Sequence, residues 1–254
     1  MKHLVLSLFP GIDLFGMAFE REGFCVVRGP DIIWGQDVRT WSAISNKFDV
    51  VIGGPPCKMF SSVGRWVPNH NENRIPDFAR VVYEAQPKCF VMENVREAPL
   101  PHVDGYARRA YVLNSHDYGA NQNRIRRFTF GYPNDGRLQS FPFTPEAPLP
   151  ISDRELDPFP TVLASEGKFP TDCAGRRKLG RRLTLAEVCE LQGVPELAEA
   201  WCFLPRGKSK RKVYRKEFEY ELIGNGVEMR VGRVVARAVR RGLELLEIGG
   251  IRDE

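Results

Sequence analysis

The chain has 254 residues, of which 43% are hydrophobic and 27% are charged, and its formal net charge is +5. This length allows one large domain, or one domain with a small lobe, and the composition is that of an ordinary soluble protein. The sequence holds no run of roughly 18 apolar residues, which argues against a membrane span. Its six cysteines form no CxxC pair and histidine occurs four times, so we expect reduced thiols, no metal site and a cytoplasmic protein.

The first half of the chain alternates short apolar runs with helical patterns. Strands are predicted at 3–9, 24–29, 48–54, 88–94 and 128–133, and helices at 13–23 and 76–86. Because apolar strands that alternate with helices form parallel sheets, we expect an α/β fold with a Rossmann-like, mostly parallel sheet and helices on both faces. Such sheets bind ligands beyond the carboxyl ends of their strands.

The second half changes character. Residues 133–180 are rich in Pro, Gly and Asp and show little periodicity, which predicts a small irregular lobe. A helix is predicted at 183–196, where Thr184 and Glu187 form a capping box, and a long amphipathic helix follows at 231–247. We therefore expect three parts: a first domain at 1–132, the lobe at 133–180, and a return to the first domain at 181–254.

Two basic segments lie in the C-terminal third. "GRRKLGRR" (175–182) has five bases and no acid, and "RGKSKRKVYRK" (206–216) has seven bases and no acid. Such segments are often solvated surface, but they also suit a polyanion, of which the phosphate backbone of a nucleic acid is the commonest.

The segment "GGPPCKMFSS" (53–62) places Cys57 behind two prolines at the end of a predicted strand. One interpretation is a small thiol in the core. The other is a nucleophile, because prolines fix φ and so hold the thiol in one orientation on a stiff turn.

Further short motifs follow one another along the chain. They are F-P-G-I-D (9–13), GQDV (35–38), GPPCKMFS (54–61), ENV (93–95), YGANQNRIRR (118–127), RRLTLAEVCELQGVP (181–195) and IGNGV (223–227). In kind and in order this succession resembles the cytosine-C5 DNA methyltransferase family, over nearly the whole chain. The resemblance implies methylation of cytosine in duplex DNA with S-adenosylmethionine as cofactor, by a cytoplasmic protein encoded in a bacterium or phage.

The resemblance also implies three catalytic residues. Cys57 matches the nucleophile that bonds to C6 of the cytosine, and Glu93 matches the acid that gives a proton to N3. Arg124 matches the arginine that contacts O2 of the base, while Gln122 and Arg126 brace the site or bind nucleic acid.

For the cofactor, the residues that match the family's contacts are Phe9, Gly11, Asp37, Val38, Pro56, Asn225 and Val227. Asp37 matches the acid that accepts from the adenine amino group. A ribose acid is expected after the second strand, and Asp31 is the residue available there.

Several positions depart from the family pattern. Asp13 and Leu14 stand where a second glycine pair is usual, so a carboxylate there either binds the methionine amino group or hinders the cofactor. Lys58 replaces a glutamine, Asn121 replaces a proline, and "GVEM" replaces the usual ending of the last motif. A derivative of S-adenosylmethionine that carries another one-carbon group therefore stays an alternative.

The expected DNA contacts lie mainly after the nucleophile. Residues 58–75 match the loop that closes over DNA once the target base is flipped out, and its candidate contacts are Lys58, Ser61, Arg65, Asn69, Asn71 and Asn73. The lobe at 133–180 is short for the family, so we expect a short or relaxed recognition site. Three biological roles stay open: modification beside a cognate restriction enzyme as partner, an orphan enzyme, or protection of phage DNA.

Two other functions remain as alternatives. A tRNA cytosine-C5 methyltransferase also has a small lobe, but the Cys-Phe-Thr signature of that branch is absent, since "WCFLP" stands at 201–205. A cofactor-binding, non-catalytic DNA-binding protein is the third reading, and the presence of Cys57, Glu93 and Arg124 argues against it.

Overall fold

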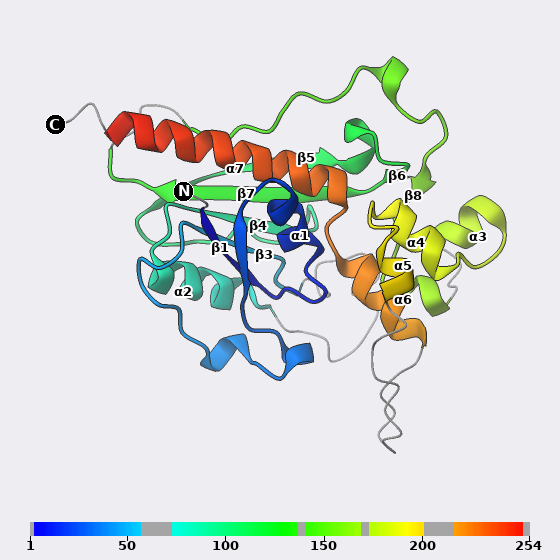
Figure 1. The fold of residues 1–254 in the computed structure, drawn as a ribbon, viewed down its shortest axis with the longest axis horizontal. Coiled ribbons are helices and arrows are strands. Elements are labelled where there is room, and N and C mark those ends of the chain that lie inside the picture. The colour runs from blue at the N-terminus through cyan, green and yellow to red at the C-terminus, as the bar shows by residue number, and fades with distance from the viewer. Residues whose placement is uncertain (1–2, 57–72, 137–140, 169–172, 201–215, 251–254) are drawn as a thin grey trace. The chain divides into compact units, whose positions relative to one another are not determined.

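The structure is a computed structural model that describes residues 3–56, 73–136, 141–168, 173–200 and 216–250 (Figure 1). These residues form two compact units. Unit 1 comprises Met1–Leu113, Ile125–Ala147 and Gly232–Glu254, and unit 2 comprises Asn114–Arg124 and Pro148–Val231. This division differs from the expected three parts, because the helices after residue 181 pack with the preceding lobe instead of returning at once to the sheet.

Unit 1 contains a six-stranded sheet with the order β2-β1-β3-β4-β7-β5 (Figure 1). The strands are β1 (Leu4–Leu8), β2 (Cys25–Arg28), β3 (Val50–Gly53), β4 (Cys89–Asn94), β5 (Tyr106–Asn114) and β7 (Ile125–Pro133). The first four are parallel to their neighbours, and β7 pairs antiparallel with β4, with Glu93 opposite Phe128. The prediction of a mostly parallel α/β sheet is confirmed.

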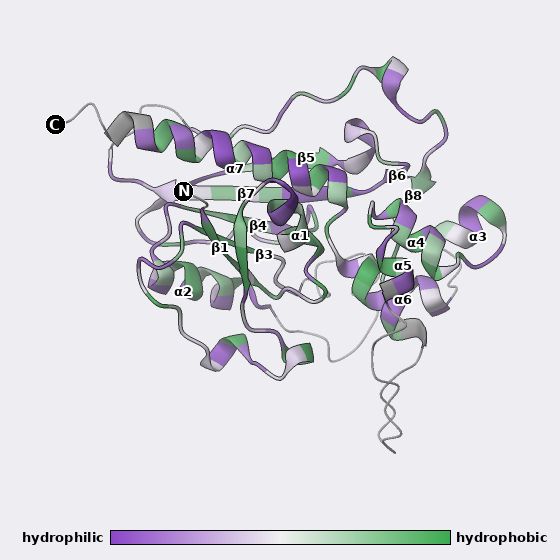
Figure 2. Cartoon of the chain, viewed as in Figure 1, coloured by the Kyte–Doolittle hydropathy of each residue, from purple (hydrophilic) through white to green (hydrophobic). Residues whose placement is uncertain are grey.

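The core of unit 1 lies between this sheet and its helices. Strands β1 and β3 are apolar along most of their length, as Figure 2 shows in green, because they are covered on both faces. Helix α1 (Leu14–Arg21) buries Leu14, Phe15 and Phe19, and α2 (Ile75–Ala85) buries Phe78 and Val82. Two short 3₁₀ turns, η1 (Ile32–Trp34) and η2 (Val38–Thr40), follow β2.

Helix α7 (Met229–Gly250) enters unit 1 at Gly232, and Figure 1 shows it running along the sheet beside β7. Its apolar stripe is buried, including Val235, Val239 and Leu243. A Cβ atom at Gly242 would overlap the ring of the buried Phe143, so glycine allows the close approach. The predicted amphipathic helix is confirmed and is longer than expected.

Unit 2 is mainly helical. Its elements are η5 (Ser115–Tyr118), β6 (Gln122–Asn123), η6 (Ile151–Asp153), β8 (Phe159–Pro160), η7 (Glu166–Lys168), α3 (Ala174–Leu179), α4 (Leu185–Leu191), α5 (Leu197–Ala200) and α6 (Lys216–Asn225). The capping box predicted for α4 is present: the Thr184 side chain accepts from the Glu187 amide, and the Glu187 carboxylate accepts from the Thr184 amide.

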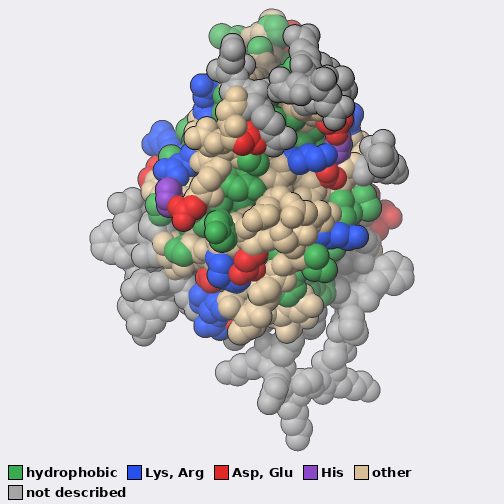
Figure 3. All heavy atoms as spheres, turned by 90° about the vertical axis from the view of Figure 1, so that its left-hand side faces the viewer, with side chains coloured by type: hydrophobic (Ala, Val, Ile, Leu, Met, Phe, Trp, Pro, Cys, Tyr) green, Lys and Arg blue, Asp and Glu red, His purple; other side chains and the backbone are tan. Residues whose placement is uncertain are grey.

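The surface of the described residues carries both signs of charge. On the face drawn in Figure 3, acidic and basic side chains are interspersed with hydrophobic ones. In the parts of the chain that the structure describes, no helix is both long enough and apolar enough to cross a membrane.

Candidate active site

The parallel strands β3 and β4 end side by side, so their carboxyl ends lie at the same end of the sheet in unit 1. β3 ends at Gly53 and continues as Gly54, Pro55 and Pro56, and the Asn94 amide at the end of β4 donates to the Pro55 carbonyl over 3.2 Å. A Cβ atom at Gly54 would lie 3.2 Å from Oε2 of Glu93, so this glycine lets the carboxyl group lie close against the turn. Cys57, Lys58, Ser61, Arg65, Asn69 and Asn71 lie outside the described residues.

Glu93 lies at the end of β4 and is nearly buried, with 8% of its surface exposed. Its Oε1 forms an ion pair with Nε of Arg126, 3.2 Å away, at the start of the neighbouring strand β7. The side chain of Arg126 is itself only 19% exposed. The structure therefore pairs Glu93 with Arg126 at the end of the sheet where β3 leads into Pro55 and Pro56.

Arg124 has a different environment, inside unit 2. It is 1% exposed, and its guanidinium donates to the carbonyls of Val162, Gly224 and Gly226 over 2.8 to 2.9 Å. These three bonds hold the guanidinium among backbone carbonyls, and the side chain has almost no exposed surface for a base to reach. The contact of Arg124 with O2 of the cytosine therefore stays a prediction that these contacts do not support, since they are all with the backbone of unit 2.

Gln122 is also structural. It is completely buried, its amide nitrogen donates to the Leu191 carbonyl and the Gln192 side chain, and its oxygen accepts from the Val162 amide. Gln192 in turn donates to the Ile223 carbonyl over 2.7 Å. The Gln122 side chain has no exposed surface, so the structure gives no support to a nucleic-acid contact, and that role stays a prediction. Its other predicted role, as a brace, agrees with these contacts.

The turn between β1 and α1 is tied to the segment after β2. The Gly11 amide donates to Oδ2 of Asp31 over 2.9 Å, and the indole nitrogen of Trp34 donates to the Gly11 carbonyl over 2.9 Å. Phe9 and Gly11 both have positive φ, 54° and 57°. The structure thus brings together three predicted cofactor residues, and it adds Trp34, which the motif pattern did not indicate.

Asp13 and Leu14 begin α1 and are both buried, with 1% exposed surface. Asp13 is the N-cap of the helix, and its side chain accepts from the Gly16 amide. Because the carboxylate is enclosed by protein groups, its position is that of a structural cap, and a direct contact with a cofactor would require it to leave those groups.

Asp37 and Val38 lie at the start of η2. Hydrogen bonds from the Arg39 guanidinium lower the pKa of Asp37 to about 2, so the group is a carboxylate at neutral pH. Val38 is buried, with 5% exposed surface. Asp37 is therefore a permanent acceptor, although Arg39 occupies part of its lone-pair capacity.

The remaining predicted cofactor residues have mixed exposure. Pro56 follows β3 and is exposed, and Asn225 is exposed at the end of α6. Val227 is 5% exposed and packs inside unit 2. Glu228, which the motif pattern did not single out, is buried next to it, and burial raises its pKa.

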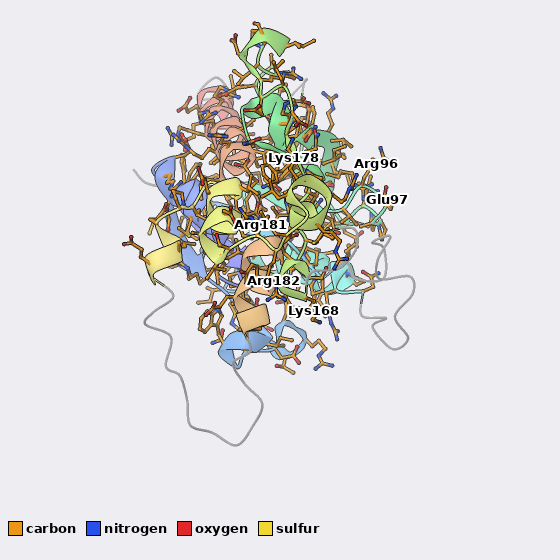
Figure 4. All side chains as sticks on the ribbon, turned by 90° about the vertical axis from the view of Figure 1, so that its right-hand side faces the viewer. Arg96, Glu97, Lys168, Lys178, Arg181 and Arg182 are labelled. Atoms are coloured by element: carbon orange, nitrogen blue, oxygen red, sulfur yellow. The ribbon has the colours of Figure 1, made fainter. Side chains whose placement is uncertain are left out.

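The first basic segment lies on α3 and the residues after it in unit 2, where Arg176, Arg177, Arg181 and Arg182 are exposed. Figure 4 labels Lys178, Arg181 and Arg182, with Lys168 of η7, on the side that faces the viewer. Arg181 is paired with Glu187 at 2.6 Å. The second basic segment, 206–216, falls almost entirely outside the described residues.

Comparisons with known proteins agree with this combination of fold and motifs. Residues 31–158 match the family of C-5 cytosine-specific DNA methylases. The chain belongs to this family of methyltransferases.

Individual relatives share about a third of their aligned residues or fewer with this chain. The chain is 30% identical over 182 residues to the Type II methyltransferase M.FnuDI of Fusobacterium nucleatum, in an alignment that covers 59% of this chain and 52% of that protein. It is 30% identical over 210 residues to M1.HphI of Haemophilus parahaemolyticus, covering 66% and 56%. The chain thus spans about half the length of these curated relatives.

Among solved structures, the fold is similar to that of a DNA modification methyltransferase encoded within a prophage of E. coli. The TM-score is 0.63 at 18% identity, with 96% of this chain and 100% of that chain covered. At this identity the likeness concerns the fold.

Proposed function

We propose that the chain is a DNA cytosine-C5 methyltransferase that modifies a flipped cytosine with S-adenosylmethionine. The observation that carries the proposal is the Glu93–Arg126 ion pair, which lies beside the turn that leads to Cys57. The acid and the guanidinium come from β4 and β7, and the segment that leads to Cys57 follows β3, which neighbours β4 in the sheet.

The reaction assigns a bond change to each group. The Cys57 thiolate adds to C6 of the cytosine, the C5–C6 double bond opens, and N3 takes a proton from the Glu93 carboxyl. C5 becomes nucleophilic and would take the methyl group from the sulfonium of the bound cofactor, which would leave as a neutral thioether. Water or hydroxide then takes the C5 proton, the thiolate leaves C6, and N3 returns its proton to the Glu93 carboxylate, so that the ring and the acid are both restored.

The two arginines of the Q-N-R-I-R motif exchange their expected roles in this proposal. Arg126, next to Glu93, contacts O2 of the base and stabilises charge that develops on the ring. Arg124 holds the carbonyls of Val162, Gly224 and Gly226 in place.

The segment after β2 suits an adenosine group. Asp31 offers a carboxylate for hydroxyl donors, and Ile32 and Trp34 are 75% and 58% exposed beside the glycine turn, where they can cover a purine ring. Asp37 is a further acceptor. When bound, S-adenosylmethionine supplies a methyl group on a positively charged sulfur.

The substrate of the proposal is duplex DNA. Extruding the target nucleobase costs about a few kcal/mol. The exposed arginines of α3 in unit 2 would contribute phosphate contacts that do not depend on the DNA sequence. A cognate restriction enzyme that cleaves the unmodified DNA sequence is the proposed partner.

The test is incubation of the full chain with tritiated S-adenosylmethionine and either duplex DNA or tRNA. We expect label at C5 of cytosine in DNA and no label with Cys57→Ser. Label confined to tRNA would replace the substrate, and DNA retention without label would refute the enzyme. A duplex with 5-fluorocytosine should trap a covalent adduct on the Cys57 peptide, which mass spectrometry would detect.

A further inference from the structure

Asp13 lies inside the turn that leads from β1 into α1, and its buried carboxylate joins three elements. Ser7 of β1 donates its hydroxyl to Oδ1 over 2.7 Å, and the Gly16 amide of α1 donates to the same oxygen over 3.0 Å. Nε of Arg28, at the end of β2, lies 3.1 Å from Oδ2. One side chain thus fixes the strand, the helix and the neighbouring strand relative to one another.

The backbone at Asp13 closes the turn from the other side. Asp13 has a φ of 64°, which is uncommon for a residue other than glycine, and its amide donates to the Pro10 carbonyl over 2.5 Å. Gly11 lies inside this closed turn and is the residue that Asp31 and Trp34 bind. A change in the backbone conformation at Asp13 should therefore also shift Gly11, which is two residues away in the same turn.

Gly16 provides the space for this arrangement. A Cβ atom at position 16 would overlap the carboxylate of Asp13. Asp13 is a short side chain held by Ser7, Gly16 and Arg28, so it cannot move aside without losing those contacts. The residues at positions 13 and 16 are therefore sterically coupled.

We infer that Asp13 is a positioning residue that holds the 9–14 turn in the shape that binds the cofactor, without touching the cofactor itself. The inference rests on the proposed cofactor site. It differs from the direct contact with a methionine amino group, because the carboxylate is 1% exposed and already serves protein donors.

The charge of Asp13 links this role to pH. Burial raises the pKa of Asp13 to about 6, while Ser7, Arg28 and Gly16 act in the opposite direction and Glu20, which also pairs with Arg28, adds to the increase. As the pH falls through about 6 the carboxylate gains a proton, and its bonds to Arg28 and Gly16 weaken. Cofactor affinity should then fall.

The experiment measures the Kd of S-adenosylmethionine by calorimetry at pH 7.5 and pH 5.5, and kcat at saturating cofactor at pH 7.5. Asp13→Gly should raise Kd about tenfold, the size of one charge-assisted hydrogen bond, and leave kcat within about twofold. Asp13→Asn keeps an oxygen for Ser7 and Gly16, so it should show an intermediate Kd that no longer depends on pH between these values. Glu20→Gln is the matched control, since Glu20 pairs with the same Arg28 at the surface, and it should keep the wild-type Kd.

A second ligand separates positioning from direct contact. 5′-Methylthioadenosine lacks the amino acid part of the cofactor, so the Asp13→Gly effect should persist with it. Loss of the effect with this ligand would mean that Asp13 touches the methionine ammonium, and would overturn the inference. Gly16→Ala alone should weaken cofactor binding, and adding Asp13→Gly should relieve the clash, whereas additive losses would contradict the steric coupling.

The outcomes distinguish the inference from the proposed function. If the wild-type chain binds no S-adenosylmethionine, the proposed cofactor is wrong and the inference falls with it. If the wild type binds and Asp13→Gly binds equally well, the inference alone is wrong.

Discussion

Arg124 and Arg126 are separated by one residue and have opposite surroundings. Arg124 is buried and donates to three backbone carbonyls, whereas Arg126 keeps 19% of its side chain exposed beside Glu93. A buried guanidinium in a hydrogen-bonded network contributes to folding, and a partly exposed one beside an acid is available to a ligand. Separate substitutions should therefore separate stability from catalysis.

Arg126→Ala should lower kcat by roughly 10² to 10³, the cost of removing one donor to a developing negative charge, and leave the urea midpoint near that of the wild type. Arg124→Ala should lower the free energy of unfolding by about 3 kcal/mol, because it leaves buried carbonyls without donors. Initial rates and urea titrations monitored by circular dichroism measure both. A fully active Arg126→Ala, or an Arg124→Ala of wild-type stability, would contradict the exchanged roles.

The sequence identified the motif of these arginines but not which of them lies beside the acid. Residues two apart on a strand share a face, so Arg124 and Arg126 were indistinguishable by alternation. The chain passes from β6 to β7 between them, at the boundary of the two units, and this change of strand separates their environments. Glu93 was placed correctly at a strand end because "KCFVMEN" is continuously apolar up to it.

At the scale of elements, the capping box predicted from the sequence is present at the N-terminus of α4. Thr184 and Glu187 form the capping box, and Arg181 lies 2.6 Å from the Glu187 carboxylate. Hydrogen bonds from Arg181 lower the pKa of Glu187 to about 2, which is below its ordinary value of 4.5. The charged form of Glu187 therefore stabilises the folded state.

Thr184→Ala should lower the free energy of unfolding by about 1 kcal/mol. The contribution of Glu187 should be present above pH 4.5 and disappear as the pH falls toward about 2, because the folded state then loses its advantage in binding fewer protons. Urea titrations should therefore show that Glu187→Gln has a lower free energy of unfolding than the wild type at pH 6, and that this difference disappears toward pH 2.5. The difference at pH 6 should be less than about 1 kcal/mol, because the Arg181–Glu187 pair is partly solvated. Glu190→Gln, an exposed change in the same helix, is the control; a constant difference for Glu187→Gln would contradict the prediction.

Other elements were less predictable. β5 was missed because "YARRAYVLN" has two adjacent arginines and a single buried position, so it lacks the apolar pattern of a strand. Trp34 gave no signal because its contact with Gly11 joins segments 23 residues apart, and only the folded chain brings them together.

At the scale of the whole molecule, the net charge is +5, and two segments in the C-terminal third, 175–182 and 206–216, carry basic residues without acidic ones. If α3 and its flanking residues bind phosphates, DNA affinity must depend on salt through the number of contacts. Arg177→Gln with Arg182→Gln should lower the slope of log K against log salt by about 2, roughly 0.9 for each lost phosphate contact.

Fluorescence anisotropy with a labelled duplex at several salt concentrations measures this slope. Arg108→Gln with Arg109→Gln removes the same charge from β5 of unit 1 and should change the slope little. Equal changes for both pairs would mean that net charge, and not α3, governs binding.

The division into units was the least predictable feature. The change of composition at residue 133 suggested a boundary, but the chain stays in unit 1 until Ala147 because Phe143 packs against Gly242 of α7. Contacts between residues about 100 positions apart leave no trace in local composition.

The two units are interleaved along the chain, and this order matters while the protein is being made. A ribosome releases residues 148–231 before it has added the part of α7 that covers Phe143 in unit 1. Until those turns of α7 emerge, Phe143 lacks its cover, so the core of unit 1 can be completed only after α7 has been synthesised. Transplanting unit 2 between relatives would likewise require moving 114–124 together with 148–231.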